Sequence, residues 1–149
     1  MKARNLYFTK FSEAEREISS LKDKKIQTYG KWSYYQILTH LADGLEYTLK
    51  GENPKWYFPV IIQNTIGKLM LNRILRQKSM PPGLPNLIKK NTIIYGDEKE
   101  AYKRLIKVME EFKSFSGEFK PHPVFGKMTK GEWYLLHTCH FANHLSYVK

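Results

Sequence analysis

Apolar residues recur along most of this chain at intervals of three and four, the spacing that places side chains on one face of an α-helix. The clearest stripe follows Ser33 and contains Leu38, Leu41, Leu45 and Leu49. This periodicity predicts helices at 12–22, 33–50, 59–76, 97–116 and from 129 onward.

Polar residues at the expected helix starts support these boundaries. In a capping box, a Ser or Thr and the Glu or Gln three residues later each bond the other residue's backbone N–H. The chain has three such pairs: Ser12 with Glu15, Ser33 with Gln36, and Thr129 with Glu132. Pro59 and Asp97 suit the starts of the other two helices, and Gly51 suits the end of the second.

Helix-breaking residues separate the predicted helices. Ser79–Pro85 contains three prolines and a glycine, so we expect a stiff, non-helical connection there. His122–Gly126 is interpreted as an irregular loop, and Thr92–Tyr95 has β propensity but no partner strand. We therefore expect an all-α fold in one domain spanning 1–149: a bundle of four long helices, with a short extra N-terminal helix and a long Pro-rich connection.

The composition indicates a globular protein, because 42% of the residues are hydrophobic and 14% are aromatic. The single cysteine, Cys139, cannot form an internal disulfide. Neither a signal-peptide pattern nor an apolar run long enough to cross a bilayer is visible, so we expect a cytoplasmic protein. The net charge of +11 favours anionic partners, although the charge is spread along the chain.

Three histidines share one face of the last predicted helix. His137, His140 and His144 follow one another at spacings of three and four, and Trp133 and Val148 lie on the same face. The imidazoles should point inward, where each unpaired one would cost about 1–3 kcal/mol. A divalent metal would satisfy them. His140 and His144 have the i, i+4 spacing that places two imidazoles on one metal, with His137 and His140 as the alternative pair.

A catalytic-type metal site needs a third protein ligand. His40 lies in the second predicted helix, about 140° from its apolar stripe, so it is either a surface residue or faces a cleft at the bundle edge. The small Gly44 beside it would leave room for a ligand. His122 precedes a proline in a loop and is interpreted as structural or solvent-exposed. Cys139 lies on the opposite side of its helix from the histidines, so we interpret it as a packing residue.

Two stretches of the chain resemble one known superfamily. Residues 32–43, with Trp-Ser at the start and His-Leu-Ala-Asp at the end, are similar to the second helix of the DinB-like (YfiT-like) superfamily. The tail resembles an uncharacterised branch of that superfamily, which shows H-P-x-F-G, then W, then H-x-x-x-H, here at 122–126, 133 and 140–144. Residues 80–83, Met-Pro-Pro-Gly, are similar to the middle loop of the same branch.

The resemblance implies a four-helix bundle that holds a divalent metal, commonly nickel or zinc, through His40, His140 and His144. Water or substrate would take the remaining coordination positions. Characterised relatives include transferases that use a small cellular thiol and a thiol-dependent isomerase, and relatives often form dimers. Asn143 and Ser146 stand where many members carry histidine and glutamine, but neither difference removes a ligand.

Together these features suggest a metal-dependent transferase or hydrolase that acts on a small molecule. A low-molecular-weight thiol would bind the metal as a thiolate and attack an electrophile. Tyr47 and Asp43 are weak catalytic candidates, Asp43 as a hydrogen-bond acceptor for His40. His137 and Trp133 are expected to support the ligands or to line the cleft.

Two other classes of function stay open. In a non-catalytic metal-binding or interaction protein, the site would be closed, with His137 as a fourth ligand. The third helix interleaves Lys68, Arg73 and Arg76 with Ile and Leu, which fits a membrane surface but is also typical of a bundle helix. We recognise no nucleic-acid-binding motif.

The aromatic run 56–58 fits either a dimer contact or the cleft wall.

Overall fold

The computed structural model describes residues 4–51, 56–81 and 93–149. Within them all regular structure is helical apart from two isolated β-bridges, so the expected all-α class is confirmed. The elements are α1 (Phe11–Ser20), α2 (Tyr34–Lys50), α3 (Val60–Ile62), the π-helical turn η1 (Gln63–Gly67), α4 (Lys68–Gln77), α5 (Glu98–Ser114) and α6 (Lys130–Leu145). None of the described helices combines the length and the apolar character needed to cross a membrane.

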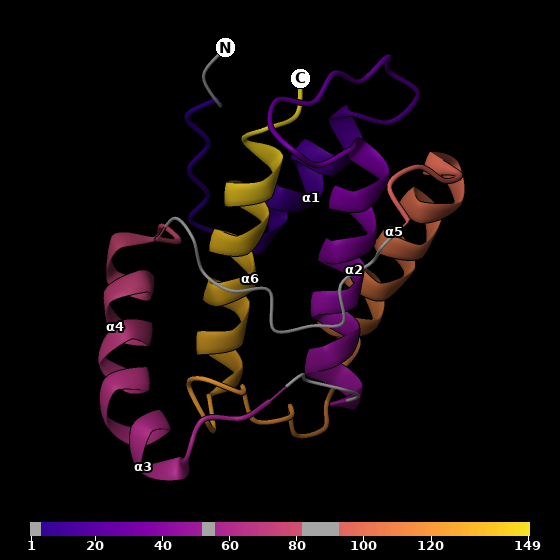
Figure 1. Ribbon diagram of the computed structural model, residues 1–149. Coiled ribbons are helices and arrows are strands. Elements are labelled where there is room, and N and C mark those ends of the chain that lie inside the picture. The colour runs from indigo at the N-terminus through magenta and orange to yellow at the C-terminus, as the bar shows by residue number, and fades with distance from the viewer. Residues whose placement is uncertain (1–3, 52–55, 82–92) are drawn as a thin grey trace.

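Helices α2 and α6 lie side by side at the centre of the fold (Figure 1). Helix α5 packs on the other side of α2, and both α1 and α4 pack against α6. The segments α3, η1 and α4 follow one another without a break, so 60–77 is one helical segment with a π turn inside it. This matches the helix predicted at 59–76.

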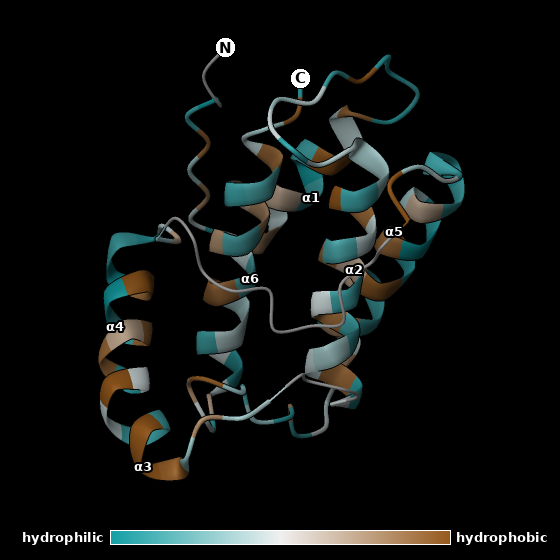
Figure 2. Cartoon of the chain, viewed as in Figure 1, coloured by the Kyte–Doolittle hydropathy of each residue, from teal (hydrophilic) through white to brown (hydrophobic). Residues whose placement is uncertain are grey.

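The main hydrophobic core is shared by α1, α2, α5 and α6. Phe11 of the short α1 contacts Phe112 of α5 and Phe141 of α6, with ring centroids 5.5 Å apart in both cases. Figure 2 shows hydrophobic and polar positions alternating along these helices, as expected for elements that bury one face. The N-terminal helix is therefore part of the core rather than an addition to it.

A second, smaller core joins α4 to α6. Leu71 and Ile74 of α4 are fully buried there, together with Trp133 and Cys139 of α6. Gln63 fastens the π turn to the loop before α6, because its side-chain amide donates to the carbonyl oxygens of Phe58 and Pro123, each at 3.0 Å.

The backbone of Gly67 approaches the same loop very closely. A β-carbon on Gly67 would lie 2.3 Å from the Val124 carbonyl oxygen, closer than any real contact. A glycine is therefore required where the helical segment 60–77 meets this loop.

Most of the predicted helix ends are confirmed. Ser33 and Gln36 form the expected capping box, as do Thr129 and Glu132. The Asp97 carboxylate accepts from the backbone N–H groups of the first turn of α5. Helix α2 ends at Gly51, whose φ of 72° is the left-handed conformation that glycine adopts without strain.

The capping box predicted at Ser12 and Glu15 is wrong. Helix α1 begins at Phe11, and Ser12 is an exposed residue of its first turn. The Glu13 carboxylate instead accepts from the backbone N–H groups of Thr9 and Lys10. The buried Phe11 places the helix start, and Glu13 then supplies the cap from inside the helix. Helix α1 also ends at Ser20, two residues earlier than predicted.

Two predicted connections are described only in part. Residues 79–81 are non-helical, as expected, whereas 82–85 lie outside the described residues. Ile93–Tyr95 form no strand, and Thr92 lies outside the described residues.

We expect Ser33→Ala to lower the free energy of unfolding by about 1 kcal/mol, because the variant loses the side-chain oxygen that accepts from the Gln36 N–H. Ser12→Ala, at the rejected capping position, should change it by a few tenths of a kcal/mol at most. Urea denaturation of the two variants beside the parent measures both values. Equal losses in the two variants would contradict the assignment of the caps.

Candidate metal centre

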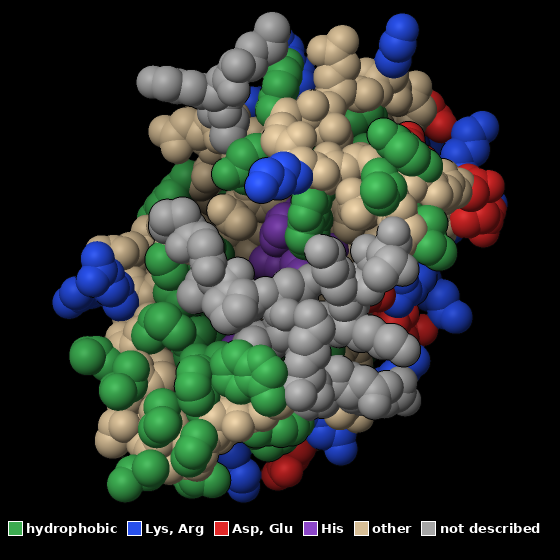
Figure 3. All heavy atoms as spheres, viewed as in Figure 1, with side chains coloured by type: hydrophobic (Ala, Val, Ile, Leu, Met, Phe, Trp, Pro, Cys, Tyr) green, Lys and Arg blue, Asp and Glu red, His purple; other side chains and the backbone are tan. Residues whose placement is uncertain are grey.

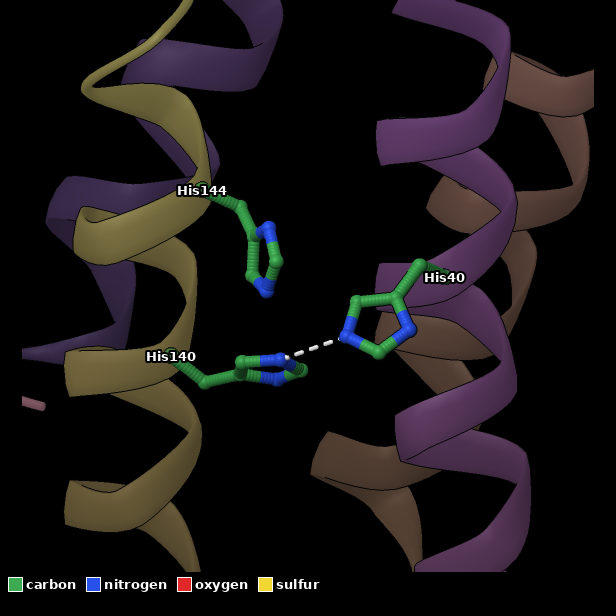
Figure 4. A group of neighbouring side chains, drawn as sticks. All are labelled: His40, His140 and His144. Carbon is green, nitrogen blue, oxygen red and sulfur yellow. Dashed lines mark hydrogen bonds between the residues drawn. The ribbon is translucent and has the colours of Figure 1, made fainter. Parts of the chain in front are cut away.

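Three histidine side chains converge between the two central helices (Figure 4). His40 comes from α2, and His140 and His144 come from successive turns of α6. One ligand nitrogen from each lies within 4.8 Å of the other two, and the Nε2 atoms of His40 and His140 are 2.9 Å apart. Two nitrogens bound to one ion at about 2.1 Å lie about 3 Å apart when cis, so His40 and His140 already have the spacing of two ligands on one metal, and a His144 nitrogen lies within 4.8 Å of both.

The three rings also contact one another and Trp32. The His144 ring centroid lies 4.6 Å from that of His40 and 4.7 Å from that of His140. The Trp32 indole stacks on His144 at 5.1 Å and meets the edge of His40 at 4.8 Å. Trp32 thus limits how the His40 and His144 rings can rotate. Sequence reasoning did not assign it this role, although it precedes the N-cap of α2.

Burial keeps the three imidazoles uncharged. It lowers the pKa of His40 to about 3 and that of His144 to about 4, and it holds the pKa of His140 well below the ordinary 6.5. For His40 and His140, repulsion between neighbouring imidazolium charges adds to the effect. At neutral pH each ring is therefore neutral and has one nitrogen with a free lone pair, as a metal ligand requires.

The donor set fits a divalent transition metal. Imidazole nitrogens suit zinc, nickel, copper and iron, whereas calcium and magnesium prefer oxygen. No further His, Cys, Asp or Glu joins this group in the part of the chain that the structure describes. Histidine atoms are visible from outside in the space-filling view (Figure 3).

His137 lies close to this group but faces Thr48 of α2. Its Nε2 lies 2.8 Å from the Thr48 hydroxyl oxygen, and that hydroxyl lies 3.1 Å from the Gly44 carbonyl oxygen. Both contacts can be hydrogen bonds at once only when the single hydroxyl proton goes to the carbonyl, so we assign the His137 Nε2–H as the donor to Thr48. His137 is thus a hydrogen-bonded, inward-facing histidine that ties α6 to α2.

Gly44 was expected to leave room for a ligand, but histidine rings lie beside it in the structure. The rings of His140 and His137 occupy that side of α2. A β-carbon on Gly44 would make ordinary contacts with them, 3.5 Å from His140 and 3.8 Å from His137. Gly44 therefore faces the imidazoles themselves.

His122 has a structural role in its loop. Its Nδ1 accepts from the backbone N–H groups of Val124 and Phe125, at 3.1 and 3.2 Å, and its ring stacks on Phe125. Burial lowers its pKa to about 3. His122 and Gly126 also exchange backbone hydrogen bonds, so the ring closes a compact turn. This agrees with the structural interpretation of His122 made from the sequence.

Trp133 connects this turn to the histidine group. Its ring stacks on His137, with centroids 5.5 Å apart, and lies 5.5 Å from the His122 ring. Its indole N–H and the Nδ1 of His137 are both buried without a hydrogen-bond partner among the described residues. All five histidines of the chain therefore gather in one region, from the loop at 122 to the convergence of His40, His140 and His144.

The two weak catalytic candidates face away from the three converging histidines. The Tyr47 hydroxyl lies 2.9 Å from the Pro121 carbonyl oxygen and 3.0 Å from the Tyr57 hydroxyl, and burial raises its pKa. Asp43 forms an ion pair with Arg104 of α5 at 2.6 Å. Arg104 also pairs with Glu46, so this face of α2 is fixed to α5. No hydrogen bond joins Asp43 to His40 among the described residues.

Cys139 lies where the sequence places it, on the side of α6 that faces α4. It is buried in the second core, and burial raises the pKa of its thiol to about 11. A thiol with that pKa stays protonated at neutral pH, which suits a packing residue.

A family model matches the whole length of the chain. The family model DUF1569, described as a protein of unknown function, matches residues 1–149. The chain belongs to the DUF1569 family. No curated protein and no solved structure gave a match. In this DUF1569 chain, the histidine group is therefore the feature that points to a function.

We expect Thr48→Val to lower the free energy of unfolding by about 1–3 kcal/mol, because the substitution leaves the His137 Nε2–H buried without an acceptor. Thr138→Val is the matched control. Thr138 is also buried in a helix, and its hydroxyl donates only to the carbonyl four residues earlier, at Tyr134, among the described contacts. Chemical denaturation should show a clearly smaller loss for Thr138→Val. A similar loss in both variants would argue against the hydrogen bond to His137.

The pKa shifts predict that the metal-free protein loses stability in mild acid. In the unfolded chain histidine titrates near 6.5, whereas His122 and His137 titrate at about 3 in the folded protein. Between these values the unfolded state binds more protons, so the free energy of unfolding should decrease as the pH falls from about 6.5 towards 3.

Denaturant titrations at several pH values measure this slope. His122→Asn retains an acceptor for the two backbone N–H groups but loses the titrating ring, so its slope should be shallower than that of the parent. An unchanged slope would contradict the shifted pKa of His122.

Proposed function

We propose that this protein binds one divalent transition-metal ion through His40, His140 and His144 and uses it to transform a small molecule. The observation that carries the proposal is the convergence of three uncharged imidazole nitrogens within 4.8 Å. Two helices far apart in sequence supply them, and each buries its ligands against Trp32 or the neighbouring imidazoles. Nickel and zinc are the metals we favour, because both accept imidazole readily.

An enzymatic role is supported by the number of ligands. Structural zinc sites are closed by four protein ligands, whereas catalytic sites keep a position open. The group has three members among the described residues, and His137, the residue best placed to close it, donates to Thr48 instead. Histidine atoms can also be seen from the surface in Figure 3. These features favour a site that a substrate can enter.

A divalent ion held by three neutral imidazoles supplies Lewis-acid chemistry, because its uncompensated charge lowers the pKa of a water or thiol that binds to it. The chain's residues hold and shield the site. Trp32 restricts two ligand rings and excludes water from one side of His144. His137 and Thr48 keep the two ligand-bearing helices in register. The net charge of +11 attracts an anionic substrate.

The proposed substrate class is a small thiol with an electrophile, and the reaction is group transfer or hydrolysis. This part rests on the resemblance of residues 32–43 and of the C-terminal tail to the DinB-like superfamily. We place the chain in that superfamily as part of the same proposal, and a homodimer is proposed on the same basis. Neither Tyr47 nor Asp43 is assigned a catalytic role, because each is held by another partner.

We expect the purified, untagged protein to contain about one equivalent of divalent metal, and His40→Ala, His140→Ala and His144→Ala each to lose it, because each variant removes one of three ligands. Elemental analysis measures this directly. His122→Asn is the control, since it also removes an imidazole but leaves the group intact. The melting temperature of the stripped parent should rise when zinc or nickel is added. Retention of metal by the three alanine variants would contradict the assignment.

The open position is tested with the cobalt-substituted protein. A small thiol that enters the metal's coordination shell should change the visible absorption spectrum, because thiolate ligation adds intense bands. An unchanged spectrum at saturating thiol, with cobalt bound, would favour the alternative of a non-catalytic metal-binding protein.

A further inference from the structure

One part of the chain is strongly basic and carries no acid. Between Glu52 and Asp97 the sequence contains seven Lys or Arg residues and no Asp or Glu. The described residues 56–81 hold four of these cations: Lys68, Arg73, Arg76 and Lys78. More than half of the net charge of +11 therefore comes from less than a third of the chain.

The helical segment 60–77 in this region leaves large aliphatic side chains in solvent. Ile61 and Leu69 are each 73% exposed, and Val60 and Ile66 are exposed to a similar degree. Figure 2 shows α3 as strongly hydrophobic, and Figure 3 shows hydrophobic side chains gathered over the lower part of the molecule, where α3 and α4 lie in Figure 1. Exposed aliphatic side chains in a contiguous group mark an interaction site.

The exposed side chains lie on one face because of how the segment packs. Gln63, Gly67, Leu71 and Ile74 are buried on the inner face, against the loop before α6 and against α6 itself. Leu69 is followed by Arg73 four residues later and Arg76 seven residues later, so these side chains share the opposite face. We call this face, made of Val60, Ile61, Ile66, Leu69, Arg73 and Arg76, the outer face of α3–α4.

Among the described residues, the four cations of segment 56–81 form no ion pair with a carboxylate. Neither Arg73 nor Arg76 pairs with a carboxylate in the part of the chain that the structure describes; Arg73 contacts only the Gln77 amide. Lys68 donates to the Lys127 carbonyl oxygen, and Lys78 lies over the Tyr7 ring. The aromatic residues Trp56 and Tyr57, directly before α3, are also exposed.

Charge complementarity decides what can cover this face. A second copy of the chain would bring the same cations against each other in a two-fold contact, which is unfavourable. Nucleic acid would pair with the cations but would leave the exposed aliphatic side chains, Val60, Ile61, Ile66 and Leu69, without an apolar partner. Protein surfaces that bind nucleic acid contact the bases mainly through polar and aromatic side chains. An anionic lipid surface offers phosphates for the cations, acyl chains for the aliphatics, and an interfacial layer that suits Trp and Tyr.

We propose that the outer face of α3–α4 docks this protein reversibly on a membrane surface that contains anionic lipid. The aliphatic side chains enter the boundary between headgroups and acyl chains, and Arg73 and Arg76 contact the headgroups. This proposal is independent of the metal centre.

Cosedimentation of the full chain with vesicles tests the proposal. The protein should bind vesicles that contain about a third phosphatidylserine and bind pure phosphatidylcholine vesicles far less. Arg73→Ser/Arg76→Ser should weaken binding about 5-fold for each cation removed, the equivalent of about 1 kcal/mol. Ile61→Ser/Leu69→Ser should weaken it at least as much, through loss of apolar insertion. Tryptophan emission should shift to shorter wavelength on binding, and this shift should vanish in Trp56→Phe.

Lys24→Ser/Lys25→Ser is the matched control for charge. It removes the same two charges from exposed positions in the loop between α1 and α2, which lies at the opposite end of the molecule from α3 in Figure 1. It should bind within about 2-fold of the parent. Circular dichroism checks that each variant is folded.

Four outcomes would overturn the proposal. The first is no binding to the anionic vesicles at low salt, and the second is an equal loss of binding in the Lys24/Lys25 control. The third is a dimer in sedimentation analysis that Leu69→Ser converts to a monomer, because a second copy would then cover the face. The fourth is duplex DNA that competes with the vesicles and binds as tightly to Ile61→Ser/Leu69→Ser as to the parent.

Discussion

Burying imidazole is the constraint on which the rest of this structure depends. A charged histidine is costly to desolvate, so every histidine that is drawn into the interior must stay neutral and is stabilised when at least one ring nitrogen meets a suitable partner. The protein does this in three ways. His122 accepts from its own loop backbone, His137 donates to Thr48, and His40, His140 and His144 face one another. Helices α2 and α6 must therefore keep one register, because a shift of either would separate several of these pairs together.

Helices α5 and α4 support that register from opposite sides. On one side Arg104 of α5 pairs with Asp43 and Glu46 and holds the polar flank of α2. On the other side α4 packs on the face of α6 that carries Cys139, and Gln63 ties the π turn to the loop that precedes α6. The histidine group lies between helices that are each fixed by a partner, which is the arrangement a precise ligand set requires.

The sequence predicted the features that depend on only a few neighbouring residues. The caps at Ser33 and Thr129 were predictable because a capping box is complete within four residues, and the shared face of His140 and His144 follows from helical geometry alone. The cap at Ser12 failed because burial of Phe11 in the core moved the start of the helix, which no local pattern reveals. The pairing of Asp43 with His40 was also wrong, because Asp43 accepts from Arg104, which lies 61 residues away in sequence. The stacking of Trp32 on His144 depends on how α2 and α6 meet, so spacing within one helix could not predict it.

The π turn at 63–67 has a consequence for how this segment tolerates change. It contains one residue more than an α-helical path would need, and that residue sets the rotation of α3 relative to α4. Deleting a single residue there would restore regular α-helical hydrogen bonding, yet it would turn Val60 and Ile61 by about 100° relative to Leu71 and Ile74. Gln63 would then lose its place opposite Pro123. Insertions and deletions in this stretch are therefore expected to be far more disruptive than substitutions at the same positions.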